Sequence, residues 1–169
     1  MLALASLASA QAPEAIDSPS IDMAGYLRIA SAAAAHREHH RVSEREFARL
    51  AQLPGTVILD ARSRDKYERL HIAGAINLGF PDIAVATLRE RMPDRSMRIL
   101  IYCNNNFVDS PAFPVKLPAA SLNLSTFIAL YTYGYRDVWE LGGPAIDPAR
   151  SLLSFEGTEA PPSRAKPTS

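Results

Sequence analysis

Short runs of apolar, often β-branched residues alternate along this chain with longer stretches in which apolar residues recur at helical spacing. The short runs predict buried strands and the longer stretches predict helices with one apolar face. We expect strands at residues 57–60, 75–78 (after a tight turn at Gly74), 99–102 and 138–141, with Val42 as a further short strand residue. We expect helices at residues 23–37, 43–53, 65–70, 83–91 and 122–133, with one more helical turn over 147–155.

Strands therefore alternate with helices, and a few residues join each pair. This order is typical of βαβ units, whose parallel strands need a crossover helix between them. The sequence predicts an α/β fold with an open, mostly parallel sheet that is flanked by helices on both faces.

The composition divides the chain into four segments. We interpret residues 1–20 as a signal peptide remnant and linker, 21–40 as an N-terminal helix, 41–149 as the folded domain and 150–169 as a disordered C-terminal tail. The tail is rich in Pro, Ser and Thr, a composition that buries too little apolar surface to fold by itself.

The first residues resemble an export signal in part. Leu2 to Ala10 are small or apolar, and Ala8-Ser9-Ala10 has the A-x-A form of a secretory cleavage site. No Lys or Arg precedes Arg28, so the segment is either a clipped or minimal signal peptide or only a terminal tail. A signal peptide predicts a periplasmic or secreted protein, whereas a tail would leave the protein in the cytoplasm.

The charge balance, the hydropathy pattern and the cysteine count exclude several classes of protein. The 169 residues carry 18 Lys and Arg against 18 Asp and Glu, so the formal net charge is zero. This balance argues against nucleic-acid binding, which needs a basic face, and no apolar run approaches membrane-spanning length. Cys103 is the single cysteine, which excludes an internal disulfide and a cysteine-rich zinc site.

Two histidines, His36 and His40, lie four residues apart at the end of the first helix. This spacing would place both rings on one helix face, as in some metal sites. No cysteine or carboxylate completes a ligand set, so we favour a polar helix end and expect neither metal nor cofactor.

The stretch around Cys103 carries the candidate chemistry. Cys103 ends a predicted buried strand, and a long loop with prolines leads from it to a helix that begins near Ser121. Ligands of open α/β sheets bind at this edge, and a helix N-terminus favours the thiolate. We therefore interpret Cys103 as a reactive thiol rather than an inert buried one.

Several motifs together resemble the rhodanese-like domain. They occur in the family's order over residues 41–149 and comprise Leu59-Asp60-Ala61-Arg62, Tyr67, His71-Ile72-Ala73-Gly74-Ala75-Ile76-Asn77-Leu78, Ile99-Leu100-Ile101-Tyr102-Cys103, Tyr133-Gly134-Tyr135-Arg136-Asp137-Val138 and Leu141-Gly142-Gly143. The chain is also similar to a divergent secreted subgroup that carries the string Tyr-Cys-Asn-Asn-Asn-Phe. The resemblance implies a rhodanese-like α/β fold with Cys103 at the reactive position. It also implies that Cys103 attacks a sulfane donor, becomes a persulfide and passes the sulfur to an acceptor.

The loop after Cys103 departs from the family pattern. Family members reach the next helix in about five residues and often carry an arginine there, whereas here the helix begins at Ser121. Asp109 occupies the sixth position after the cysteine, and Lys116 is the only cation before the helix. A carboxylate beside the thiol would repel anionic donors, whereas Lys116 could fold back and hold an anion or remain solvated.

Further candidates surround Cys103. Asn104, Asn105 and Asn106 could donate amide hydrogen bonds to substrate or could form a turn. Phe107 could close the site as a lid together with a buried Phe113. Arg62 could bind substrate or brace the scaffold. We expect the remaining two, Asp60 and His71, to support the loops through hydrogen bonds.

Three functions compete. The first is a sulfurtransferase acting through Cys103 on a small sulfur-containing anion, with a thiol as acceptor. The second is a silent module that binds a protein or an anionic ligand through the 104–120 loop. The third, a phosphatase of the dual-specificity kind, needs an arginine at the end of the loop, and the sequence has none there.

Overall fold

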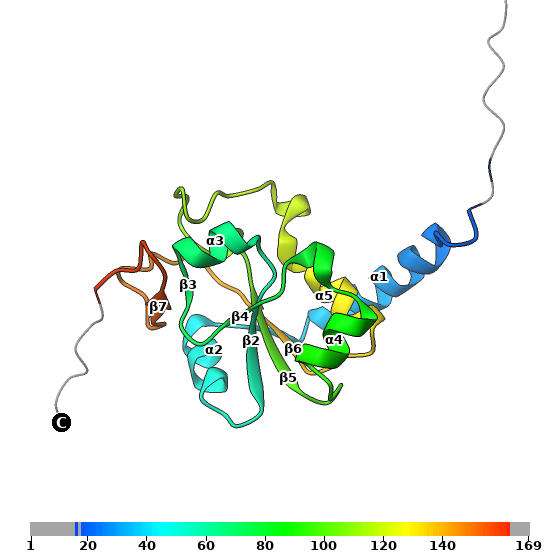
Figure 1. Ribbon diagram of the computed structural model, residues 1–169, viewed down its shortest axis with the longest axis horizontal. Coiled ribbons are helices and arrows are strands. Elements are labelled where there is room, and N and C mark those ends of the chain that lie inside the picture. Colours follow the sequence, from blue (N-terminus) through cyan, green and yellow to red (C-terminus); the bar gives the residue numbers. More distant parts are fainter. Residues whose placement is uncertain (1–15, 17, 163–169) are drawn as a thin grey trace, which may run out of the picture.

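The computed structural model describes residue 16 and residues 18–162 of the chain, and in it helices and strands alternate (Figure 1). The α-helices are α1 (Met23–Arg37), α2 (Glu44–Ala51), α3 (Arg64–Arg69), α4 (Val85–Arg91) and α5 (Leu122–Thr132). The strands are β1 (Arg41–Val42), β2 (Thr56–Asp60), β3 (His71–Ile72), β4 (Ile76–Asn77), β5 (Arg98–Tyr102), β6 (Val138–Leu141) and β7 (Phe155–Glu156). Three short 3₁₀ turns are η1 (Phe80–Asp82), η2 (Asn104–Asn106) and η3 (Pro118–Ala120).

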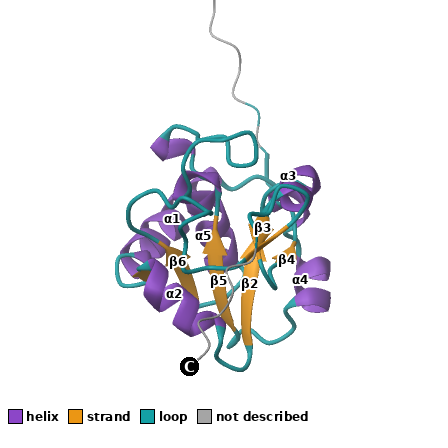
Figure 2. Cartoon of the chain, turned by 90° about the vertical axis from the view of Figure 1, so that its left-hand side faces the viewer, coloured by secondary structure: helices purple, strands orange, loops and turns teal. Residues whose placement is uncertain are grey.

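Five parallel strands form the central sheet in the order β1-β6-β5-β2-β4. β5 lies in the middle and pairs with β2 over its whole length, so that Asp60 lies opposite Tyr102. Helices cover both sides of these strands (Figure 2). The predicted α/β fold with a mostly parallel sheet is therefore confirmed.

Side chains of β5 alternate between two separate cores. Ile99 and Ile101 pack with apolar residues of α1, α4 and α5, whereas Leu100 and Tyr102 pack with α2 on the other face. All four are buried, because a central parallel strand is covered on both sides. The residue that follows Tyr102 therefore points toward α5 if the strand continues in extended form.

The predicted helix over 83–91 is shorter than expected. Pro81 lies in the 3₁₀ turn η1, and α4 begins only at Val85. The reason is a local cap: the Thr87 hydroxyl accepts a hydrogen bond from the N–H of Ala84 at 3.1 Å. Ala84 is thus the N-cap of α4: its N–H is bonded by a side chain of the first helical turn, so the helix begins at the next residue, Val85.

The prediction of a helical turn over 147–155 is wrong. A tight turn at Asp147 ends where the Arg150 N–H bonds the Asp147 carbonyl at 2.9 Å. The chain then extends into β7, which pairs antiparallel with β3 so that Phe155 lies opposite Ile72. Leu153 and Phe155 contact the core on the α2 side, whereas Leu152 and Ser154, before and between them, are exposed. This two-residue alternation is that of an extended chain, not of a helix.

Residues 150–162 consequently do not form the free tail that we expected. The N–H groups of Thr158 and Glu159 bond carbonyl oxygens of α3 at 3.0 and 2.9 Å. Residues 163–169 and the expected cleavage site at residues 8–10 lie outside the described residues. None of the described helices is both long and apolar enough to cross a membrane.

Candidate active site

Cys103 directly follows the central strand and lies at the N-terminus of α5. Its backbone is extended (φ −146°, ψ −173°), so the alternation of β5 continues and the thiol points to the α5 side of the sheet. There Sγ lies 3.3 Å from the hydroxyl oxygen of Ser121. The residue is only 1% exposed, so the thiol is covered in this conformation.

Ser121 is the residue that sequence reasoning missed at this point. It is the N-cap of α5, a position where serine normally accepts a hydrogen bond from the first helical turn. Its side chain makes no such cap bond and lies against the thiol instead. A serine at the start of the helix after the cysteine loop was the available signal in the sequence.

The backbone after Cys103 folds into the 3₁₀ turn η2. Its later N–H groups are used: Asn106 bonds the Cys103 carbonyl, Phe107 bonds the Asn104 carbonyl and Val108 bonds the Ile146 carbonyl. The Cys103 N–H bonds the side chain of Asn106. Within the described residues, the N–H groups of Asn104 and Asn105 make no hydrogen bond. Adjacent unpaired N–H groups of this kind form a binding place for an anion.

The three asparagine side chains shape the loop. Asn105 both donates to the Lys116 carbonyl at 2.7 Å and accepts from the Lys116 N–H at 3.1 Å. Asn106 accepts from the Cys103 N–H at 2.8 Å, and Asn104 accepts from Arg62 at 3.4 Å. These contacts match the turn-forming role, and direct contact with substrate stays a prediction for all three.

The long loop has an anchored part and an exposed part. Phe107 and Phe113 are fully buried, with their rings stacked 4.1 Å apart. Residues 114–120 are exposed, and Lys116 belongs to this part. The Asp109 carboxylate accepts from the Val115 N–H at 3.0 Å, so it braces the loop. The part of the loop that leads into Ser121, residues 114–120, is therefore exposed and is held to the rest of the protein through Asn105 and Asp109.

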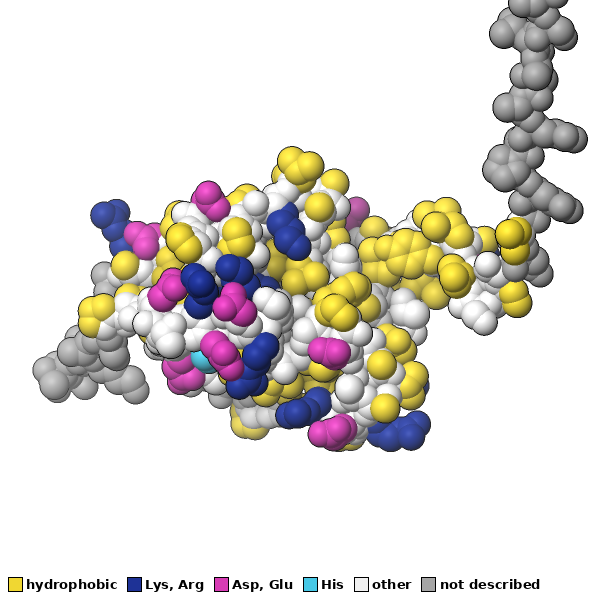
Figure 3. Space-filling view, turned by 45° about the horizontal axis from the view of Figure 1, so that its top comes forward, with side chains coloured by type: hydrophobic (Ala, Val, Ile, Leu, Met, Phe, Trp, Pro, Cys, Tyr) yellow, Lys and Arg dark blue, Asp and Glu magenta, His cyan; other side chains and the backbone are white. Residues whose placement is uncertain are grey.

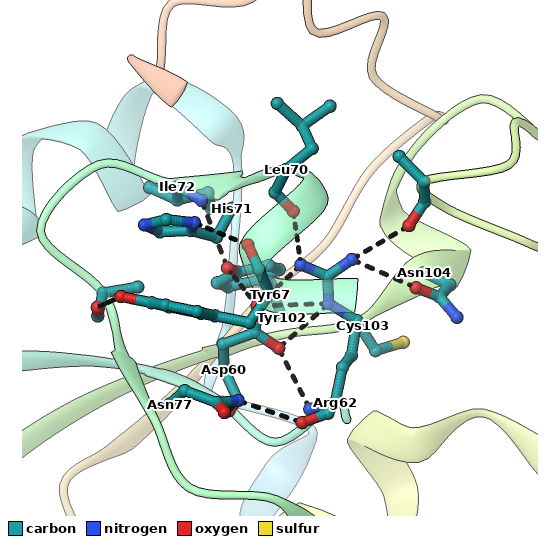
Figure 4. Close-up of polar contacts among 12 residues, drawn as sticks. Asp60, Arg62, Tyr67, Leu70, His71, Ile72, Asn77, Tyr102, Cys103 and Asn104 are labelled. Carbon is teal, nitrogen blue, oxygen red and sulfur yellow. Dashed lines mark hydrogen bonds and ion pairs between the residues drawn. The ribbon is translucent and has the colours of Figure 1, made fainter. Parts of the chain in front are cut away.

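Arg62 lies just after β2 and is bound on all sides by the protein (Figure 4). Its five N–H donors bond the Asp60 carboxylate, the Leu70 and Ala112 carbonyls and the Asn104 side chain. Burial by itself would lower the Arg62 pKa, but the ion pair with Asp60 raises it on balance. The guanidinium therefore has no donor left for a substrate in this conformation, and substrate binding by Arg62 stays a prediction.

Tyr102 completes this buried network. Its hydroxyl donates to Asp60 at 2.7 Å and accepts from the Ile72 N–H at 3.1 Å. Burial and then the Asp60 charge raise the Tyr102 pKa well above its usual value. This network joins the carboxyl ends of β2 and β5 through Asp60, Arg62 and Tyr102. It therefore fixes the position of Cys103, the residue that follows β5.

His71 lies at the edge of the same network. One ring nitrogen lies 2.7 Å from the Tyr67 carbonyl, and the two rings stack at 3.7 Å. The other nitrogen lies 3.4 Å from the Glu156 carboxylate of β7. His71 therefore ties α3 to the C-terminal strand, and Figure 4 shows the Cys103 sulfur apart from it.

His36 and His40 are half-buried and bound to neighbouring groups of the protein. The rings stack 3.9 Å apart, and each has a ring nitrogen 2.8 Å from a backbone carbonyl, that of Arg136 for His36 and that of His36 for His40. Across residues 16 and 18–162, no three His, Cys, Asp or Glu side chains are grouped to hold a metal ion.

Polar groups without a full charge surround Cys103. The Ser121 hydroxyl at the α5 N-terminus lies against Sγ, and the two residues after Cys103 have unpaired backbone N–H groups, which are groups that can bind an anion. The face drawn in Figure 3 mixes acidic and basic side chains, so a broad basic field around the molecule is not evident there. A nucleophilic thiolate would therefore be supported by local donors.

Comparison with known proteins gives one family and a set of similar folds. A family profile described as the rhodanese-like domain matches residues 43–143. The chain is similar to the BH2092 protein of Bacillus halodurans, with 18% identity, a TM-score of 0.50, and coverage of 79% of this chain and 88% of that one. It is also similar to the rhodanese-like domain of the Alr3790 protein of Anabaena, with 21% identity, a TM-score of 0.50, and coverage of 77% and 89%. No curated protein sequence gives a significant match.

Proposed function

Because this chain belongs to the rhodanese-like domain family, we propose that it is a sulfurtransferase that carries sulfane sulfur as a persulfide on Cys103. The observation that carries the proposal is the position of the thiol, 3.3 Å from Ser121 at the start of α5 and directly before two unpaired N–H groups. Hydrogen-bond donors around this thiol would stabilise the negative charge on sulfur in a reaction that passes through a thiolate and an anionic persulfide.

The proposed reaction has two displacement steps. The thiol first gives its proton to solvent, and the Cys103 thiolate attacks the outer sulfur of a donor such as thiosulfate. The sulfur–sulfur bond of the donor breaks, sulfite leaves with the electron pair, and Cys103 becomes a persulfide. A thiophilic acceptor, such as a small thiol or a protein thiol, then attacks the outer sulfur and releases the Cys103 thiolate. Ser121 would donate a hydrogen bond to the anionic sulfur in both steps.

Burial of Cys103 requires that its cover open for each exchange. The exposed segment 114–120 is joined to the turn below it through the paired hydrogen bonds between Asn105 and Lys116. Two neutral hydrogen bonds are worth about 2 kcal/mol together, so brief opening is within thermal reach. The proposal therefore includes a loop that opens to admit donor and acceptor.

Mass spectrometry tests the proposal directly. The protein is incubated with thiosulfate, and separately with a polysulfide, and the intact mass and the Cys103 peptide are measured. We expect one added sulfur on Cys103 that is removed by cyanide or dithiothreitol, and none on Cys103→Ser. The sulfurtransferase proposal fails if neither donor loads the cysteine under any condition in which the protein is folded.

A second candidate is a module without catalysis that binds a protein or an anion through the 104–120 loop. The burial of Cys103 favours it, as does the lack of any hydrogen bond from a Lys or Arg side chain to the thiol among the described residues. If Cys103→Ser keeps the full biological activity of the protein, this candidate replaces the first.

A further inference from the structure

A line of polar side chains runs beneath the Cys103 turn and ends on the N-terminal helix. The Cys103 N–H bonds Asn106 Oδ1 at 2.8 Å, and the same oxygen accepts from Asn123 at 3.1 Å. Asn123 also donates to Glu140 Oε1 at 3.2 Å. Both oxygens of Glu140 in turn accept from Arg37 of α1, through Nη2 at 2.8 Å and through Nε.

This line lies on the same face of the sheet as the thiol. Glu140 is opposite Ile101 in the register of β5 and β6, and its neighbour on that face of β6 is the buried Val138. A carboxylate in such a place is costly unless it is paired and fully hydrogen-bonded. Glu140 is 6% exposed and meets this requirement through Arg37 and Asn123.

The contacts leave one orientation for each amide. Asn123 has two donors on its nitrogen, and one goes to Glu140 while the other goes to Asn106. The Asn106 oxygen therefore faces two donors, and its nitrogen donates to the Leu141 carbonyl. A reversed Asn106 amide would present its nitrogen to the Cys103 N–H and its oxygen to the Leu141 carbonyl. Glu140 orients Asn123, which thereby adds a second donor to the Asn106 oxygen that holds the Cys103 backbone.

We propose that Glu140 and Arg37 are positioning residues for the chemistry of Cys103, which makes α1 a working part of the site. Arg37 lies outside residues 43–143, the span that matches the family. By holding the Cys103 N–H inward, the line keeps the neighbouring N–H groups of Asn104 and Asn105 available to an anion. This inference rests on the proposed sulfur transfer for its kinetic part only.

Amide hydrogen exchange tests the positioning without any sulfur chemistry. In full-length Arg37→Gln, the Cys103 amide should exchange about tenfold faster, because the line loses its charged anchor. The Ile99 and Ile101 amides of the same strand should keep their protection. The matched control is Glu46→Gln, which breaks a two-pronged Glu–Arg pair with Arg49 on the exposed surface of α2 and should leave Cys103 unchanged.

Sulfur loading provides the second readout. Arg37→Gln should lower kcat/KM for persulfide formation from thiosulfate about tenfold, partly through a higher KM, because the N–H groups of Asn104 and Asn105 would bind the anionic donor less well. Arg37→Lys keeps the charge and should restore part of both the rate and the amide protection.

Two outcomes overturn the inference. One is unchanged Cys103 exchange in Arg37→Gln. The other is a loss of protection that is equal at Ile99, Ile101 and Cys103, which would mean that the pair only stabilises the fold. If the unmodified protein does not load sulfur at all, the proposed function fails, and the exchange experiment still decides whether Arg37 positions Cys103.

Discussion

The Sγ atom of Cys103 lies 3.3 Å from the Oγ atom of Ser121, although 18 residues separate them in the chain. The loop between them therefore starts and ends beside the thiol. The long loop thus returns the chain to Cys103, so that the start of α5 helps to bury the thiol.

Replacement of Ser121 by alanine should slow sulfur loading of Cys103. The hydroxyl can donate to an anionic sulfur, and hydrogen bonds to charged groups are worth about 1.5–3 kcal/mol, so we expect a decrease of roughly ten- to a hundredfold. The rate of persulfide formation, followed by mass spectrometry, measures the effect. Ser125→Ala, on the same helix, is the control, and an equal loss in both variants would argue against a role for Ser121.

Replacement of Asn105 by alanine should make Cys103 more accessible. The variant loses both hydrogen bonds to the Lys116 backbone, so the exposed segment 114–120 should open more often. We expect Cys103 to react up to about thirtyfold faster with a neutral disulfide reagent, since two neutral hydrogen bonds worth about 2 kcal/mol together are lost. Gln52→Ala, at the end of α2, should react like the unmodified protein. Equal rates in all three proteins would show that Asn105 does not hold the cover.

Stability should fall at alkaline pH partly because of Tyr102. Burial and the Asp60 charge raise its pKa well above the usual tyrosine value of 10.0, so the folded protein keeps a neutral phenol where the unfolded chain ionises. This contribution is intact below about pH 10 and is lost as the pH rises further, by up to about 1.4 kcal/mol per pH unit.

The free energy of unfolding in urea, measured from about pH 8 to pH 11, checks this dependence. Tyr102→Phe should be less stable at neutral pH, because the Asp60 hydrogen bond is lost, but its stability should fall less steeply above pH 10. Some slope should remain, since the pKa values of Tyr67 and Tyr135 are also raised. Identical slopes in the two proteins would exclude Tyr102 as the source.

Replacement of Gly157 by alanine should detach the C-terminal strand. Gly157 has φ +124°, and a Cβ atom there would lie 2.4 Å from the Arg69 carbonyl oxygen. We expect the Thr158 and Glu159 amides, which bond α3, to lose their protection from hydrogen exchange. Gly143→Ala is the matched control: φ is +104° but no atom lies within 4 Å of its Cβ. It should cost about 1–3 kcal/mol and leave the two amides protected, whereas protection in both variants would contradict the prediction.

The sequence predicts those parts of the fold whose signals are local. Apolar runs located β2, β5 and β6, and Ser121 marked the start of α5 within one residue. Cys103 was recognisable because it follows such a run. These elements depend on burial of neighbouring residues along one strand or helix, which periodicity reports directly.

Pairings between distant segments left no such signal. β7 became visible only through its contact with β3, because a two-residue strand has no readable period. Glu140 resembled an ordinary strand residue, since its partner Arg37 is 103 residues away. The alternatives for Arg62 could not be weighed from the sequence, because the carbonyls of Leu70 and Ala112 that occupy its donors come from other parts of the chain.

The ion pair between Arg37 and Glu140 also affects the choice of boundaries for a recombinant fragment of this protein. A recombinant fragment limited to residues 43–143 would contain Glu140 without its counter-charge and Ile72 without the strand that covers it. The cooperative folding unit is thus larger than the span that sequence comparison recognises. A fragment meant for biochemistry should begin before Asp22 and extend past Glu159, and shorter ones should aggregate or lose reactivity even though Cys103 itself is present.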